Sequence, residues 1–177
     1  MSRSSLTLYT PDNNARPVHA ELIELLSSLK LTGESLGSFE FLAGRHFFSH
    51  ITFLGCAPNI PTSHAQGPNI VRITVPPLAK PELFAGLNAP APLCPDCKQP
   101  LQEWKHLIKH NVKGQISCPR CYATASVRHL NYRKRACFSQ SIIRIAPIFE
   151  SEALPANGLL DTLNEALNTH FEYAFIG

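Results

Sequence analysis

With 177 residues, 44% of them hydrophobic and 16% charged, the chain is long enough to bury one core without disulfide support. This composition excludes a wholly disordered protein, and apolar stretches such as ITFLGCA at residues 51–57 are too short to cross a bilayer. The amino-terminal segment MSRSSLTLYTPDNN has no apolar stretch of the length of a secretory signal. We therefore expect a cytoplasmic protein with no membrane partner.

Charge is unevenly distributed along the chain, although the net charge is only +3. Residues 98–135 contain nine basic residues and one acidic residue, which gives +8, whereas the remainder contains seven basic and twelve acidic residues, which gives −5. Such a division indicates two surfaces with different partners, or two modules.

The first predicted elements are a short strand at residues 5–10 and an amphipathic helix over residues 18–29. We expect Asn13 or Asn14 to cap the helix, and Gly33 to be the left-handed residue that follows its end. The apolar positions at helical spacing are Val18, Leu22, Leu25, Leu26 and Leu29.

Residues 39–58 are rich in aromatic and β-branched side chains, and two interpretations fit them. Phe47, Ile51 and Phe53 alternate as in a strand, which we favour, but Phe47, Phe48, Ile51 and Leu54 also form a helical stripe. A loop is expected at residues 57–69, and the alternating IVRITV at residues 70–75 predicts a strand.

The proline-rich residues 76–92 predict a linker into a cysteine-containing module, and FSQSIIRIAPIF at residues 138–149 predicts a strand after it. Asn157 is expected to cap a second helix, and a last strand follows at residues 171–175. The apolar face of the second helix comprises Leu159, Leu160, Leu163, Ala166 and Leu167.

These elements predict an α+β fold, in which a two-layer body combines a mostly antiparallel sheet with two helices. We expect residues 1–92 and 136–177 to form the body. The inserted residues 93–135 would then form a metal-binding ribbon with a basic C-terminal extension.

The strongest chemical signal is a pair of CPxC motifs at Cys94, Cys97, Cys118 and Cys121. Two residues between thiolates let a tight turn aim both sulfurs at one point, and two such turns complete a tetrahedron. Residues 93–125 resemble the zinc-ribbon group, whose knuckles commonly have this form. Many of those knuckles have Gly after the second cysteine, whereas Lys98 and Tyr122 stand there in this chain.

The resemblance implies one structural Zn²⁺ held by the four cysteines. Iron in a rubredoxin-like site uses similar turns and is the alternative metal. A thioredoxin-like dithiol would leave the second CxxC pair unexplained. Four thiolates on Zn²⁺ carry a formal charge of −2, so Lys98 and Arg120 are partly explained by the metal.

The negative charge of the metal site does not explain the cations beyond the second knuckle, because they lie too far along the chain from it. We predict that these cations bind a partner. These partner-binding candidates are Arg128, Tyr132, Arg133, Lys134 and Arg135. The favoured function is a non-catalytic adaptor whose basic ribbon contacts an acidic protein surface. The alternative is RNA or DNA binding, because cations hold phosphates and rings stack on bases.

An enzyme built around His46, His50 and Cys56, with His64 nearby, is the second alternative. It lacks an acidic partner and any HExxH pattern in their neighbourhood. No small-molecule substrate is identifiable from the sequence. Cys137 stands alone among apolar residues, as a buried, inert thiol does.

Overall fold

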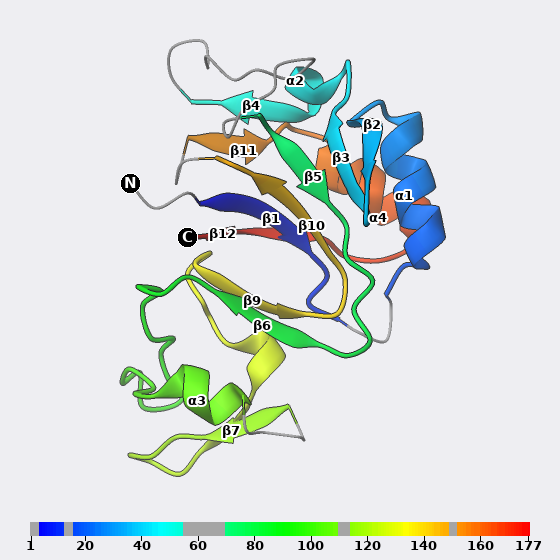
Figure 1. Cartoon of the computed structure of the whole chain (residues 1–177). Coiled ribbons are helices and arrows are strands. Elements are labelled where there is room, and N and C mark those ends of the chain that lie inside the picture. The colour runs from blue at the N-terminus through cyan, green and yellow to red at the C-terminus, as the bar shows by residue number, and fades with distance from the viewer. Residues whose placement is uncertain (1–3, 13–15, 55–69, 110–113, 149–151) are drawn as a thin grey trace.

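The computed structural model describes residues 4–12, 16–54, 70–109, 114–148 and 152–177. It confirms the predicted α+β class: a six-stranded sheet, antiparallel at every pairing, has the order β12-β1-β10-β5-β3-β2 (Figure 1). Its strands are β1 Ser5–Tyr9, β2 Thr32–Gly37, β3 Glu40–Ala43, β5 Arg72–Thr74, β10 Ile142–Ala146 and β12 Glu172–Ile176.

Helices α1 (His19–Ser28) and α4 (Leu159–Leu167) lie on one side of this sheet (Figure 1). Alternate strand residues face them, because successive side chains of a strand point to opposite faces. The resulting core is fully enclosed. Its fully buried side chains include Leu6 and Leu8 of β1, Leu22 and Leu26 of α1, Leu163 of α4, and Ile73, Ile143 and Ile145 of the central strands.

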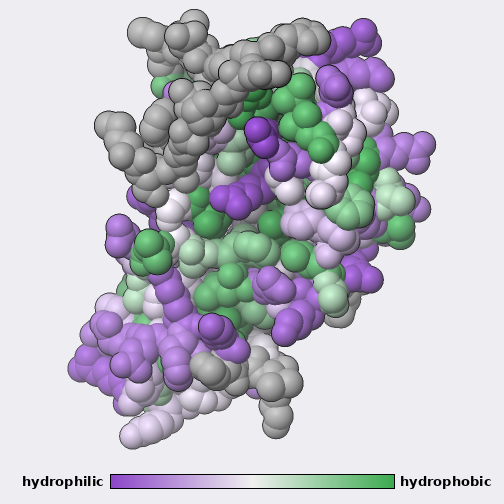
Figure 2. Space-filling view, viewed as in Figure 1, coloured by the Kyte–Doolittle hydropathy of each residue, from purple (hydrophilic) through white to green (hydrophobic). Residues whose placement is uncertain are grey.

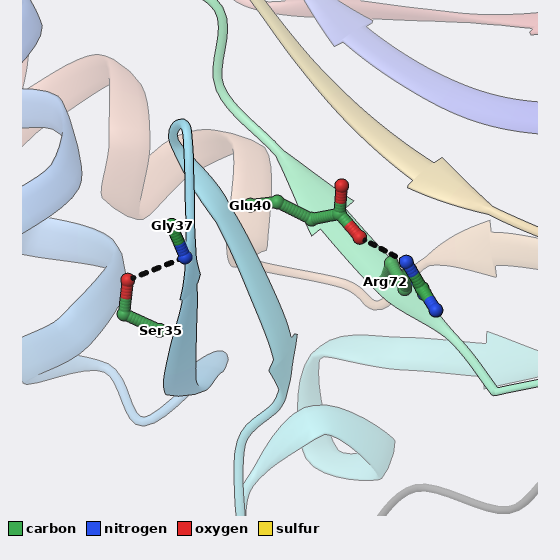
Figure 3. A network of polar contacts seen from close by, with 4 residues as sticks. All are labelled: Ser35, Gly37, Glu40 and Arg72. Atoms are coloured by element: carbon green, nitrogen blue, oxygen red, sulfur yellow. Dashed lines mark hydrogen bonds and ion pairs between the residues drawn. The ribbon is translucent and has the colours of Figure 1, made fainter. Parts of the chain in front are cut away.

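The opposite face of the sheet carries polar side chains at its β3–β5 end. The guanidinium of Arg72 donates to the Glu40 carboxylate at 2.6 Å between neighbouring strands (Figure 3). Beside them, the Ser35 hydroxyl accepts a hydrogen bond from the backbone of Gly37 at the end of β2. The ion pair is solvent-exposed, so it stabilises the fold by no more than about 1 kcal/mol.

Three two-stranded sheets complete the strand pairing of the described residues. They are β4 Ile51–Phe53 with β11 Ala153–Pro155, β6 Glu82–Ala85 with β9 Ala136–Ser139, and β7 Gln115–Ser117 with β8 Thr124–Ser126. The β6–β9 pair joins the chain entering the cysteine module to the chain leaving it. Residues 76–92 are therefore more than the linker predicted from their prolines.

Residues 39–58 differ from the favoured strand. β3 and β4 are strands, but a single helical turn, α2 Phe47–His50, separates them. The turn connects strands of two different sheets, and it buries Phe47 while leaving Phe48 half exposed. The loop predicted at 57–69 lies outside the described residues.

The helix ends also differ from prediction. Val18 occupies the N-cap of α1 without a side-chain hydrogen bond, and Asn13 and Asn14 lie outside the described residues. Lys30, with φ of 56°, is the left-handed residue after α1, whereas Gly33 belongs to β2. Gly158, with φ of 92°, takes the N-cap of α4 in place of Asn157, because glycine adopts this conformation without steric cost.

The cysteine module is built around a second apolar cluster, which also includes residues of β6 and β9. Helix α3 (Trp104–Lys109) buries Trp104 and Ile108 against Leu101 and Ile116, and the Trp104 and Tyr132 ring centroids lie 5.5 Å apart. The 3-10 helix η1 (Val127–His129) contributes Val127. On the face seen in Figure 2, the surface of this part of the molecule, at the lower left, is mostly hydrophilic.

Candidate metal centre

The four predicted cysteines converge on one point. Their Sγ atoms all lie within 4.8 Å of one another, with 3.7 Å between Cys94 and Cys121 and 3.7 Å between Cys97 and Cys118. A tetrahedral ion with metal–sulfur bonds of about 2.3 Å requires sulfur–sulfur edges of about 3.8 Å. The donor set therefore fits a tetrahedral metal ion, and it is the one such cluster among the described residues.

The two knuckles are built by the same backbone hydrogen bonds. In the first, the Cys94 N–H donates to the Gln99 carbonyl at 2.8 Å, and the Lys98 N–H donates to the Cys94 carbonyl at 3.1 Å. In the second, the Cys118 N–H donates to the Ala123 carbonyl at 2.8 Å, and the Tyr122 N–H donates to the Cys118 carbonyl at 2.9 Å. Lys98 and Tyr122 therefore occupy equivalent positions.

Both positions require a left-handed backbone. The φ angle is 58° at Lys98 and 60° at Tyr122, a conformation that costs a residue with a Cβ about 1–2 kcal/mol. The departure from Gly noted in the sequence therefore falls on strained backbone. The Lys98 ammonium donates to the Pro95 carbonyl and closes the first knuckle. The Tyr122 ring is 80% exposed.

The electrostatics of the site follow from its crowded sulfurs. The backbone N–H groups of Cys121 and Arg120 donate to the Cys118 sulfur and lower the pKa of that thiol to about 7. At Cys121 the Ala123 N–H also favours the thiolate, but desolvation of the sulfur and the neighbouring sulfurs of Cys97, Cys118 and Cys94 outweigh it and raise the pKa to about 11. A bound cation would stabilise the four cysteines as thiolates, because metal binding displaces the thiol protons.

The four cysteines of the site differ in their exposure to solvent. Cys94 and Cys118 are buried, Cys97 is half-buried and Cys121 is exposed. Residues 119–122 at the tip of the second knuckle are all exposed. The metal would thus lie beneath the surface of the ribbon, with the second knuckle outermost.

The predicted partner-binding residues Tyr132, Arg133 and Lys134 have side chains that are hydrogen-bonded within the chain. Tyr132 is buried, and its hydroxyl donates to the Val127 carbonyl at 2.6 Å. The Arg133 guanidinium donates to the Ala91 carbonyl at 2.7 Å. The Lys134 ammonium donates to the Tyr173 hydroxyl at 2.6 Å.

Arg133 and Lys134 also form a tight turn. Both are left-handed, with φ of 52° and 57°, and the Arg135 N–H donates to the Tyr132 carbonyl at 2.9 Å. The Asn131 side chain supports the turn by accepting from the Arg133 N–H. Arg128 lines a polar hollow together with Pro11 and Asp12, where the body meets the ribbon.

The histidines proposed for an enzyme have structural partners. The His50 ring Nε2 lies 3.0 Å from the Leu29 carbonyl, and at His46 the backbone N–H donates to the Lys30 carbonyl. Neither residue joins a metal-binding cluster in the part of the chain that the structure describes. Cys56 and His64 lie outside the described residues. Cys137 is buried, as predicted.

No protein-family model, curated protein or solved structure matches the chain. Among the described helices, none combines the length and apolar character that crossing a bilayer requires. The chemistry of the site therefore rests on its own residues.

Proposed function

We propose that this protein is a non-catalytic adaptor in which a structural Zn²⁺, held by Cys94, Cys97, Cys118 and Cys121, supports a ribbon that binds an acidic protein surface. The convergence of four protein thiols carries the proposal. Four thiolates fill a tetrahedral Zn²⁺, so no position is open for water or substrate. Such a metal stabilises a fold and does not activate a reactant.

The charge of the ribbon supports an acidic partner. Residues 93–135 contain nine basic and two acidic residues, a formal charge of +7. The four thiolates and Zn²⁺ together add −2, which leaves +5 on the metal-loaded ribbon. Positive potential of this size accelerates association with an acidic surface and makes binding sensitive to salt.

The position of Tyr132 removes one of the features that supported nucleic-acid binding. Stacking on a base needs an accessible ring, but the Tyr132 ring is buried and its hydroxyl is bonded to Val127. The segment Arg128–Arg135 therefore contains cations, but Tyr132, its predicted stacking ring, is not accessible to a base.

Affinity purification of the full chain from native cells, with and without nuclease, tests the proposal. We expect a protein partner whose recovery survives nuclease and falls as salt rises. Lys109 and Arg120 are exposed, so Lys109→Ser with Arg120→Ser lowers the ribbon charge without disturbing its core. This variant should recover less partner. Partner recovery that disappears with nuclease would favour the nucleic-acid alternative, and salt-insensitive recovery would contradict an electrostatic contact.

A further inference from the structure

Tyr122 is the unexplained member of a matched pair. Lys98 and Tyr122 have the same place in their knuckles, the same backbone hydrogen bond to the first cysteine and nearly the same φ angle. Glycine would hold either position without strain. The Lys98 side chain offsets its strain by donating to the Pro95 carbonyl.

No comparable contact offsets the strain at Tyr122. The side chain is 80% exposed and makes no hydrogen bond, ion pair or ring contact with the part of the chain that the structure describes. The metal site uses only its backbone N–H, which glycine would also supply. Residues in sparsely populated backbone regions cluster at functional sites, and Tyr122 combines such a backbone with a large side chain held out into solvent, where another molecule can contact it.

The neighbours of Tyr122 indicate the class of partner. Arg120 is exposed in the same knuckle, and Lys98 is exposed on the other. Tyrosine and arginine are the residue types that dominate binding energy at protein interfaces, because they combine contact area with polar groups. The ribbon that carries them has an excess of positive charge, which complements carboxylates.

We propose that Tyr122 is an anchor residue for an acidic protein segment, with its ring contacting apolar side chains of the segment and Arg120 pairing with its carboxylates. This assignment rests on the adaptor function and names the surface that performs it. It places the anchor at the tip of the second knuckle and not in the turn at residues 132–135.

Substitution of Tyr122 separates recognition from structure. Tyr122→Gly removes the ring and relieves the backbone strain, so the variant should keep its zinc content and melt at the same temperature as the parent or higher. The probe is a fluorescein-labelled peptide of alternating glutamate and leucine, followed by fluorescence anisotropy. We expect Tyr122→Gly to weaken peptide binding by at least about thirtyfold, the loss typical of an interface anchor.

Matched controls define the result. Tyr122→Phe keeps the ring and should bind like the parent, and Leu87→Ala removes a side chain that is 93% exposed elsewhere and should also bind normally. A peptide of alternating glutamine and leucine should bind weakly to every variant.

Unchanged peptide affinity in Tyr122→Gly, or no binding of the peptide by the parent, would overturn the proposal. Binding of single-stranded oligouridylate in place of the peptide would also overturn it, by assigning the tip to nucleic acid. A native partner recovered equally well by the parent and by Tyr122→Gly would overturn the anchor while leaving the adaptor function in place. Failure of the parent to recover any partner would count against the adaptor itself.

Discussion

The Lys134 ammonium lies over the ring of Tyr173, 3.8 Å from its centroid, and joins the basic extension of the ribbon to the last strand of the body. The main chain reinforces the contact, since the Phe175 N–H donates to the Lys134 carbonyl at 2.8 Å. One residue of the predicted partner surface therefore also helps to hold the two parts of the molecule together.

Replacing either side chain should destabilise the protein. We expect Lys134→Met and Tyr173→Leu each to lower the free energy of unfolding, with a coupling of about 0.5–1 kcal/mol between them, the range for an exposed cation–π contact. Chemical denaturation of the two single variants and the double variant measures this coupling. Lys109→Ser, on an exposed cation in α3, is the control and should change stability little. Fully additive effects would show that the contact contributes nothing.

The inner face of α1 gives a second prediction. Leu26 is fully buried and packs in the main core, whereas Leu25 on the same helix is only partly buried. Leu26→Ala should cost about 2–5 kcal/mol of unfolding free energy, because it removes buried methyl groups and leaves a cavity. Leu25→Ala should cost clearly less. Equal losses in urea denaturation would contradict the orientation of α1.

The periodicity of hydrophobic residues was sufficient to predict the helices and strands that pack in a single core. Alternation of Val71, Ile73 and Val75 predicted β5, and all three side chains are fully buried. The spacing of the cysteines predicted their convergence, because a knuckle is a local structure that its own backbone hydrogen bonds close.

Other features depend on contacts that no local pattern contains. β6 and β9 are separated in the sequence by the whole ribbon, yet they pair with Phe84 opposite Cys137. Because β6 finds its partner so far along the chain, the prolines around it indicated only a linker. Tyr132 is buried because it packs against Trp104. The local sequence around either residue does not reveal whether its ring lies in a core or is free to stack on a base. Strain at Tyr122 likewise appears only once the backbone angles are known.

The buried thiol of Cys137 predicts a loss of stability at alkaline pH. Burial raises its pKa far above its ordinary value of 9.0, so the thiol stays protonated in the folded protein while it ionises in the unfolded chain. Its contribution is therefore fully present below about pH 9 and declines as pH rises above that value, by up to about 1.4 kcal/mol per pH unit.

Thermal melts between neutral and alkaline pH check this expectation. The melting temperature should fall from about pH 9 upward, and Cys137→Ala should reduce the steepness of that fall, although the variant is less stable at neutral pH. Tyr9 and Tyr132 are also raised in pKa by burial, so part of the slope should remain. An identical slope in Cys137→Ala would show that the thiol is not the titrating group.

Removal of the metal should unfold the ribbon and leave the body folded. The purified protein should contain one zinc per chain without iron colour, and zinc in small modules contributes about 10–16 kcal/mol of apparent binding free energy. Trp104 is the single tryptophan of the sequence and is buried in the ribbon cluster, separate from the main core of the body. Its fluorescence therefore reports on this cluster and not on the main core.

Titration with a strong chelator should shift Trp104 emission to longer wavelength as the ring meets water. Most of the far-ultraviolet circular dichroism should persist, because α1, α4 and the six-stranded sheet have their own buried core. Cys94→Ser should show the same shifted emission without chelator, and added Zn²⁺ should restore the parent but not this variant. Bound iron, less than half an equivalent of zinc after gentle purification, or unshifted emission after complete zinc removal would contradict a structural zinc site.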